Sequence, residues 1–171
     1  MADINFTIKH IQKWEGGFVN DPFDSGGATN KGITYNTFKR FRLDNNKPIP
    51  TIEDLKNIND IEWKAIFLQN YWNKWQGNLI QDKYIATMLV DWVFHSGRWG
   101  IIIPQRLLKV RQDGIVGEIT ISAVNSADRD YLFEDLKWAR LEFLKDIVRN
   151  KPTQERFLKG WINRVESIKA K

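Results

Sequence analysis

Apolar side chains in the first fifteen residues recur with the period of an α-helix. The positions that share one helical face are Ile4, Ile8, Ile11 and Glu15. Residues spaced in this way line one side of a helix, so the pattern predicts a helix over residues 4–15 with Glu15 on the buried stripe. Gly16 and Gly17 are expected to end this helix, because glycine readily adopts the left-handed conformation of a C-terminal cap.

The rest of the chain predicts a mainly helical fold. Helical patterns cover residues 34–42, a short stretch after Thr51, and 60–75, 82–96, 99–110, 118–126 and 128–149, with a last helix beginning near Pro152. Thr34, Thr51 and Asn59 suit the N-caps of three of these helices. We expect 82–96, the most apolar segment, to be the central helix and to end at Gly97.

Three residues of the C-terminal half carry packing predictions. Pro104 lacks a backbone N–H and is expected to interrupt the helix over 99–110. Arg140 stands among apolar residues of 128–149, so an acidic partner is expected beside it. Gly160 precedes a tryptophan, which indicates close packing of the last helix.

The segment between the first two helices is rich in glycine and acids. Residues 14–34 hold five of the eleven glycines of the chain, together with Asp21 and Asp24. Glycine permits positive φ, and the polar residues around it favour turns, so we expect an irregular loop or short hairpin over 18–33. Such a loop folds back over the end of the first helix and brings Asp24 or Asp21 towards Glu15.

Glu15 and these aspartates are candidates for acid chemistry. A carboxylate on an apolar face is costly unless it is paired or protonated, and burial raises its pKa, as a general acid requires. Enzymes that hydrolyse glycosides usually place two carboxyl groups on either side of the glycosidic bond that they cleave. The alternatives are that Glu15 is an ordinary last-turn residue that reaches water, and that Asp21 and Asp24 only build a turn.

Two stretches resemble the signature of glycoside hydrolase family 108. They are Glu-Gly-Gly-Phe-Val-Asn-Asp-Pro from Glu15 and Asp-Ser-Gly-Gly-Ala-Thr-Asn-Lys-Gly-Ile-Thr from Asp24. The family comprises lysozyme-like N-acetylmuramidases of phages and bacteria, some described as secretion activator proteins. The resemblance implies an all-α, lysozyme-like fold with a small β-hairpin or irregular Gly-rich loop. It also implies cleavage of the β-1,4 bond between N-acetylmuramic acid and N-acetylglucosamine, with Glu15 as the general acid.

The second catalytic group follows from a weaker analogy. Phage-type lysozymes, a different family, are similar in having a glutamate followed by an aspartate and a threonine in a glycine-rich hairpin. By this analogy Asp24 supplies the second carboxylate, and Thr29 or Thr34 orients the attacking water.

The C-terminal half resembles the peptidoglycan-binding region that ends family 108 proteins. Asp113-Gly-x-x-Gly-x-x-Thr is similar to such modules, although a helix–loop–helix turn without ligand contact is an open alternative. Phe157 to Val165 resembles the terminal signature of the family. We therefore expect a lysozyme-like catalytic region over 1–90 and a helical peptidoglycan-binding-like region over 91–171, packed as one body because the boundary runs inside a helix.

Aromatic side chains and one histidine are candidates for substrate contact. Tyr71 and Trp72, together with Trp75, cluster at the end of the segment 60–75, and aromatic faces stack on sugar rings, but the same residues can simply form core. His95 stands where the resembled family usually has Asn-Ser-Gly. A histidine near a helix C-terminus is favoured by the dipole, so capping or packing is the alternative to substrate contact.

Composition narrows the possible partners. The chain has no cysteine, and its acids lack the spacing of a calcium loop, so we expect no disulfide, metal or other cofactor. The formal charge of +5 suits anionic polymers such as cell wall or nucleic acid. No nucleic-acid recognition motif is visible, and no apolar run is long enough for membrane insertion, so peptidoglycan glycan strands are the expected partner.

The N-terminal residues lack a basic segment followed by an apolar run, so no signal peptide is expected. We expect synthesis in the cytoplasm and action at the periplasm or cell wall, after release through a holin or a secretion system, by a monomer. The alternative function is a non-catalytic cell-wall binding or secretion-accessory protein.

Overall fold

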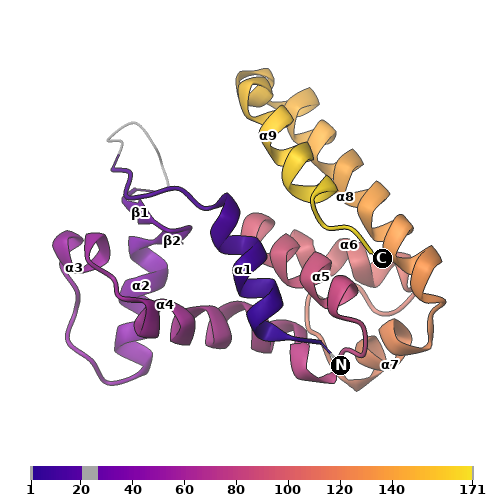
Figure 1. Cartoon of the computed structure of the whole chain (residues 1–171), viewed down its shortest axis with the longest axis horizontal. Helices are drawn as coiled ribbons and strands as arrows, with labels where there is room; N and C mark the ends of the chain where they lie inside the picture. Colours follow the sequence, from indigo (N-terminus) through magenta and orange to yellow (C-terminus); the bar gives the residue numbers. More distant parts are fainter. Residues whose placement is uncertain (1, 21–26, 171) are drawn as a thin grey trace. The chain divides into compact units, whose positions relative to one another are not determined.

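The computed structural model describes residues 2–20 and 27–170, and helices dominate both ranges (Figure 1). The predicted all-α fold is confirmed. These residues form two compact units, a smaller one over 12–70 and a larger one that combines the N-terminal residues up to Ile11 with the chain from Tyr71 onwards. Helix α1, Ile4–Trp14, contributes to both units. Within the described ranges, no helix is both long and apolar enough to cross a membrane.

The smaller unit holds three helices and a two-stranded hairpin. The helices are α2 (Tyr35–Asp44), α3 (Ile52–Lys56) and α4 (Asp60–Phe67), and the strands are β1 (Thr29–Asn30) and β2 (Ile33–Thr34). The predicted N-caps are all present. Thr34, Thr51 and Asn59 each accept a hydrogen bond from a backbone N–H of the first helical turn.

The hairpin confirms the prediction for residues 18–33 in its described part. Its antiparallel strands turn at Lys31 and Gly32, where φ is 47° and 75°. Positive φ at both central residues is the geometry that matches strand twist in a two-residue hairpin. The Asn30 side chain donates to the carbonyls of Leu55 and Lys56, at 3.0 and 2.9 Å, so the hairpin is anchored to the end of α3.

The larger unit is built around α5, Lys83–Ser96. Every side chain from Ile85 to Val93 is buried, and Gly97 ends the helix with a φ of 57°, both as predicted. The other helices of this unit are α6 (Trp99–Leu107), α7 (Glu118–Ser126), α8 (Arg129–Asn150) and α9 (Glu155–Glu166). Figure 1 shows α8 and α9 side by side as a helical hairpin, joined through the short 3-10 turn η4, Pro152–Gln154.

The prediction of one helix over 60–75 is wrong in its second half. The α-helical hydrogen bonding stops at Phe67 and continues as a π-helical turn η1, Leu68–Trp72, and a 3-10 turn η2, Asn73–Trp75. A second 3-10 turn, η3, spans Gly77–Leu79. Trp72 and Trp75 lie in these turns, and both are buried.

Pro104 does not interrupt α6, contrary to the prediction. An interior proline leaves the carbonyl four residues earlier without its helical donor. That carbonyl belongs to Gly100, and it accepts a hydrogen bond of 3.2 Å from Nε1 of the buried Trp75. The side chain thus replaces the missing backbone donor, and the helix continues to Leu107. Gly100 also lies against α5, since a Cβ at this position would be 2.4 Å from the backbone nitrogen of Val93.

A buried ion cluster joins α5, α8 and α9. Asp91 on α5 accepts hydrogen bonds from Arg140 Nη2 at 2.7 Å and from Arg164 Nη2 at 2.7 Å, and all three side chains are buried. Burial alone would raise the pKa of Asp91, but the two guanidinium groups hold this pKa well below its usual value. Asp91 is the acidic partner that the sequence predicted for Arg140.

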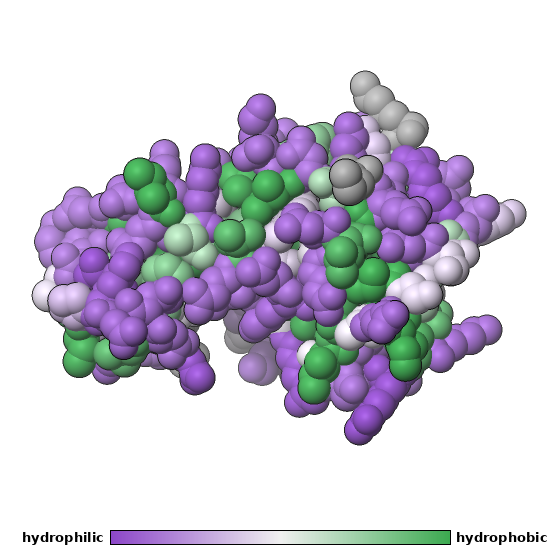
Figure 2. Space-filling model, turned by 90° about the horizontal axis from the view of Figure 1, so that it is seen from below, coloured by the Kyte–Doolittle hydropathy of each residue, from purple (hydrophilic) through white to green (hydrophobic). Residues whose placement is uncertain are grey.

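The prediction of close packing at Gly160 is wrong. A Cβ built at this position meets no atom of residues 2–20 and 27–170 within 4 Å, so no helix in these ranges requires the glycine. Figure 2 shows separate hydrophobic patches on a face that is mostly hydrophilic.

Candidate functional site

Glu15 directly follows the last residue of α1 and is half-buried. The helix therefore ends one residue earlier than predicted. Gly16 and Gly17 are exposed, and neither has the left-handed φ that the sequence predicted for a cap. A Cβ built on either glycine meets no atom of the described residues within 4 Å. The backbone after Glu15 therefore presents an open, side-chain-free surface in the described part of the chain.

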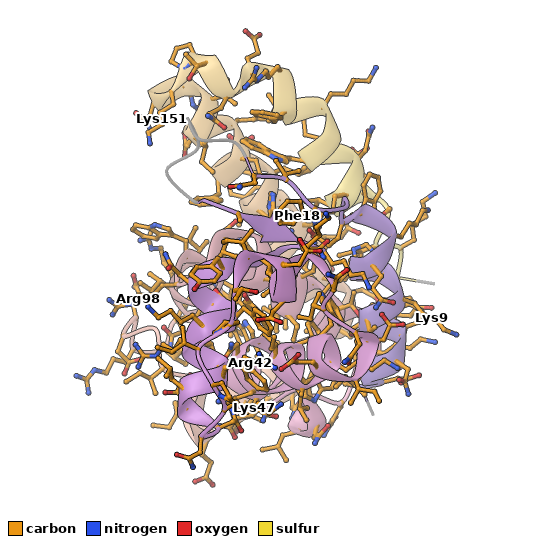
Figure 3. All side chains as sticks on the ribbon, turned by 90° about the vertical axis from the view of Figure 1, so that its left-hand side faces the viewer. Lys9, Phe18, Arg42, Lys47, Arg98 and Lys151 are labelled. Carbon is orange, nitrogen blue, oxygen red and sulfur yellow. The ribbon has the colours of Figure 1, made fainter. Side chains whose placement is uncertain are left out.

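A short segment connects Glu15 to the hairpin. Phe18, labelled in Figure 3, lies on this segment, and Val19 pairs with Thr29 through two backbone hydrogen bonds of 2.8 Å. Three residues separate Glu15 from Val19, so their Cα atoms are four residue steps apart, a distance of at most about 14 Å. The pairing thus holds Glu15 and the start of β1 in one neighbourhood.

The two candidate threonines differ in their local roles. The Thr34 hydroxyl accepts from the backbone nitrogen of Thr37 at 3.2 Å and donates to the Thr37 hydroxyl at 3.0 Å. It is therefore engaged as the cap of α2. Thr29 is half-buried on β1, and its hydroxyl lies at the long distance of 3.5 Å from the Gly27 carbonyl. Thr29 is the better candidate for orienting a water molecule.

Asp24, the candidate second carboxylate, lies outside the described residues, and so does Asp21. The approach of either aspartate to Glu15 stays a prediction.

The predicted aromatic cluster is divided between core and surface. Trp72 is only 1% exposed, its ring lies against Gly77, and its Nε1 donates to Asn78 Oδ1 at 2.9 Å. A sugar has no access to this ring, so the prediction of substrate contact by Trp72 is corrected to a core role. Tyr71 is half-buried and packs on Phe94, with ring centroids 4.7 Å apart.

His95 lies near the C-terminal end of α5 and packs edge-on against Trp161, with ring centroids 5.8 Å apart. Burial lowers the pKa of His95 to about 4, and the nearby charges of Arg140 and Arg164 act in the same direction. The imidazole is therefore neutral at neutral pH. His95 also lines a pocket of about 520 Å³ with Trp99, Phe143 and Asn150.

The sequence did not single out Trp99 or Phe143 as functional residues. Both lie in segments with a helical pattern, and an aromatic residue in such a segment is usually interpreted as part of the core. The structure shows Trp99 to be 52% exposed and within 6.5 Å of the Phe143 ring, measured between centroids. The available signal was a tryptophan two residues after the helix end at Gly97 and four residues after the predicted contact residue His95.

The Asp113-Gly-x-x-Gly-x-x-Thr motif builds a turn that is tied to α6. Gln105, fully buried, accepts from the Gly114 backbone nitrogen at 2.9 Å and donates to the Ile115 carbonyl at 2.9 Å. The Asp113 carboxylate accepts from the Ile115 nitrogen at 2.9 Å, and this bond contributes most to lowering the pKa of Asp113. The polar groups of Asp113 and Gly114 thus hold the turn in shape, and ligand contact by the motif stays a prediction.

Among residues 2–20 and 27–170, no three His, Cys, Asp or Glu side chains form a group that could hold a metal ion.

Comparison with known proteins identifies both halves of the chain. The sequence model described as Glycosyl hydrolase 108 matches residues 8–97, and the one described as Predicted Peptidoglycan domain matches residues 99–166. No curated protein matches the chain. The division predicted at residue 90 stays a prediction.

A solved structure extends the similarity to the whole chain. Brucella abortus SagA is 31% identical, with a TM-score of 0.79 over 96% of this chain and 90% of that one. The predicted lysozyme-like all-α fold is thereby confirmed. The two sequence matches support a role of the peptidoglycan hydrolase type. The chain belongs to the glycosyl hydrolase 108 family.

Proposed function

We propose that the protein hydrolyses the β-1,4 bond between N-acetylmuramic acid and N-acetylglucosamine in peptidoglycan, with Glu15 as the general acid. One observation carries this proposal. Glu15 opens the Glu-Gly-Gly motif inside the glycosyl hydrolase match, and it stands just beyond α1 rather than in the helix interior.

The local geometry suits an approaching glycan strand. Gly16 and Gly17 lack side chains, and their Cβ positions have no described atom within 4 Å. Glycine allows a ligand to pass close to the backbone. A sugar ring can therefore approach the segment beside the Glu15 carboxyl group without displacing the side chain of a described residue.

The chemistry assigns a role to each candidate. Glu15 protonates the glycosidic oxygen as the bond to the leaving sugar breaks. The oxocarbenium-like transition state needs a carboxylate or a positioned water on the opposite face of the sugar. We assign Asp24 to stabilise that charge or to activate the water, and Thr29 to orient the water through its hydroxyl.

The experiment measures turbidity loss and release of reducing ends from purified peptidoglycan. Wild-type protein is compared with Glu15→Gln, Asp24→Asn and Thr29→Val. Glu53→Gln is the matched control, because Glu53 is an exposed carboxylate on α3 of the same unit. Circular dichroism and thermal unfolding establish that each variant is folded.

We expect Glu15→Gln to remove hydrolysis while the protein stays folded, and Glu53→Gln to retain full activity. Loss of a general acid costs about 10²- to 10⁴-fold in rate. A Glu15→Gln protein that retains wild-type hydrolysis would show that another group donates the proton. A folded wild-type protein that releases no reducing ends would favour a non-catalytic cell-wall binding role.

A further inference from the structure

A groove lined with aromatic rings runs along α8 in the larger unit. One part, of about 520 Å³, is bounded by α5, α8 and α9, and a second part, of about 480 Å³, is bounded by α6 and α8. The linings of the two parts share Trp99, Phe143 and Asp146, so the parts adjoin along α8, and together we call them the α8 groove. Each part is of the size of a small-molecule site.

The aromatic rings of this groove are unusually accessible. Trp99 is 52% exposed in the shared section, and Trp138 is 65% exposed in the second part. Trp161 and Phe143 are half-buried beside them. Two accessible tryptophans along one groove offer apolar faces that no described side chain covers completely. Such faces pack on the apolar faces of ring-shaped ligands.

The polar groups of the groove suit a ligand with hydroxyl and amide groups. Asn150 and Ser96 line the first part, together with Lys151, which lies at the turn between α8 and α9 (Figure 3). The second part contains Arg106 and Glu142. The two basic side chains and the two acids, Glu142 and Asp146, cancel in formal charge. The lining therefore favours neither a strongly anionic nor a strongly cationic polymer.

His95, which also lines the first part of the groove, adds no charge. His95 is neutral at neutral pH, because burial lowers its pKa to about 4. Its ring is held in place by Trp161. Aromatic faces, polar side chains whose formal charges cancel and a neutral histidine together suit the recognition of N-acetylated sugars.

We propose that the α8 groove binds the glycan strand of peptidoglycan by stacking its N-acetylated sugar rings on Trp99 and Trp138. All lining residues except His95 and Ser96 fall within the peptidoglycan-domain match over 99–166. The identity of the polymer rests on the proposed function, whereas the site itself rests on the groove.

The test is a binding measurement on the full chain in a Glu15→Gln background, so that hydrolysis does not consume the ligand. The probes are purified peptidoglycan in a sedimentation assay and soluble tetra-N-acetylchitotetraose in a calorimetric titration. Trp99→Ala and Trp138→Ala remove the two exposed rings, and Trp99→Phe retains an aromatic face. Tyr131→Ala is the matched control, because Tyr131 lies on the same helix α8, is 78% exposed and is not part of the groove.

We expect Trp99→Ala to weaken binding of both probes about tenfold, which is the value of one good aromatic contact. Trp138→Ala should weaken binding severalfold, Trp99→Phe should restore most of the loss, and Tyr131→Ala should change nothing. Trp138 provides the decisive variant if Trp99→Ala does not fold, since its ring is largely in solvent. Equal binding by the parent and the tryptophan variants would overturn the proposal.

Two further outcomes separate this proposal from others. Light scattering that shows a dimer for the parent and a monomer for the tryptophan variants, with binding unchanged, would assign the groove to a second copy of the chain and overturn the proposal. A wild-type protein that cleaves no peptidoglycan, but whose binding still depends on Trp99 and Trp138, would refute the proposed hydrolase and leave the glycan site standing.

Discussion

Replacing Asp91 by asparagine is expected to lower the free energy of unfolding by about 3–5 kcal/mol, the cost of breaking a buried ion pair from one side. The carboxylate accepts from Arg140 and Arg164, and the three side chains join α5, α8 and α9. Asparagine preserves the shape of the side chain but removes its charge. Arg140 and Arg164 then lose the negative charge of the buried carboxylate that they share.

The geometry supports the upper part of this range. Asp91 accepts hydrogen bonds of 2.7 Å from Arg140 Nη2, of 2.7 Å from Arg164 Nη2 and of 3.0 Å from Arg164 Nε. His10 Nε2 lies 3.9 Å from the same carboxylate. Hydrogen bonds to charged groups are worth about 1.5–3 kcal/mol each, and the amide nitrogen of asparagine cannot accept from a guanidinium.

Urea unfolding at pH 7, followed by circular dichroism, measures the change. The control is Asp130→Asn, because Asp130 is highly exposed on α8 and pairs with Arg129 at the surface. An exposed pair contributes less than about 1 kcal/mol, so the control should unfold near the wild-type midpoint. An Asp91→Asn protein within about 1 kcal/mol of wild type would refute the view that this cluster depends on the Asp91 charge.

Three further predictions concern packing, pH and the α6–α7 turn. Gly100→Ala should destabilise by about 3 kcal/mol in urea unfolding, because its Cβ would meet the Val93 backbone at 2.4 Å, whereas Gly160→Ala on α9 should stabilise by about 1 kcal/mol. The pKa of His95 is about 4 in the folded protein and 6.5 in the unfolded chain, so the unfolded chain binds a proton first as the pH falls. The contribution of the neutral His95 to the free energy of unfolding is therefore complete above pH 6.5 and is lost as the pH falls to 4. This loss is about 3 kcal/mol and should be absent from a pH series of His95→Gln. Gln105→Leu should lower the unfolding free energy by about 2–4 kcal/mol, since Gly114 N–H and the Ile115 carbonyl lose their buried partner.

Local signals in the sequence predicted most of the helices correctly. Capping residues act within one turn, so Thr34, Thr51 and Asn59 could be recognised without knowledge of the fold. Arg140 is informative for a different reason. A buried guanidinium requires an acid, and this requirement holds wherever the acid lies in the sequence, here at Asp91 on another helix.

The predictions from sequence are wrong where a residue far away in the chain alters the local structure. Pro104 should break a helix, but Trp75, far away in the sequence, supplies the hydrogen bond that the proline cannot donate. The sequence allows Trp72 either to stack on a sugar or to form part of the core. Only the structure, in which Gly77 lies against its ring, shows that Trp72 belongs to the core. The exposure of Trp99 likewise depends on how α6 and α8 meet, which no periodic pattern encodes.

The acids Glu15 and Asp91 show how far burial can identify a catalytic group. An acid on an apolar helical stripe is costly, and this argument pointed to Glu15. In the structure it applies to Asp91, which is fully buried and satisfied by two arginines, whereas Glu15 lies half-buried beyond the end of α1. The case for Glu15 therefore rests on the Glu-Gly-Gly motif, the open backbone beside it and the family match. The two acids should consequently separate by experiment, with Asp91→Asn losing stability and Glu15→Gln losing hydrolysis while remaining folded.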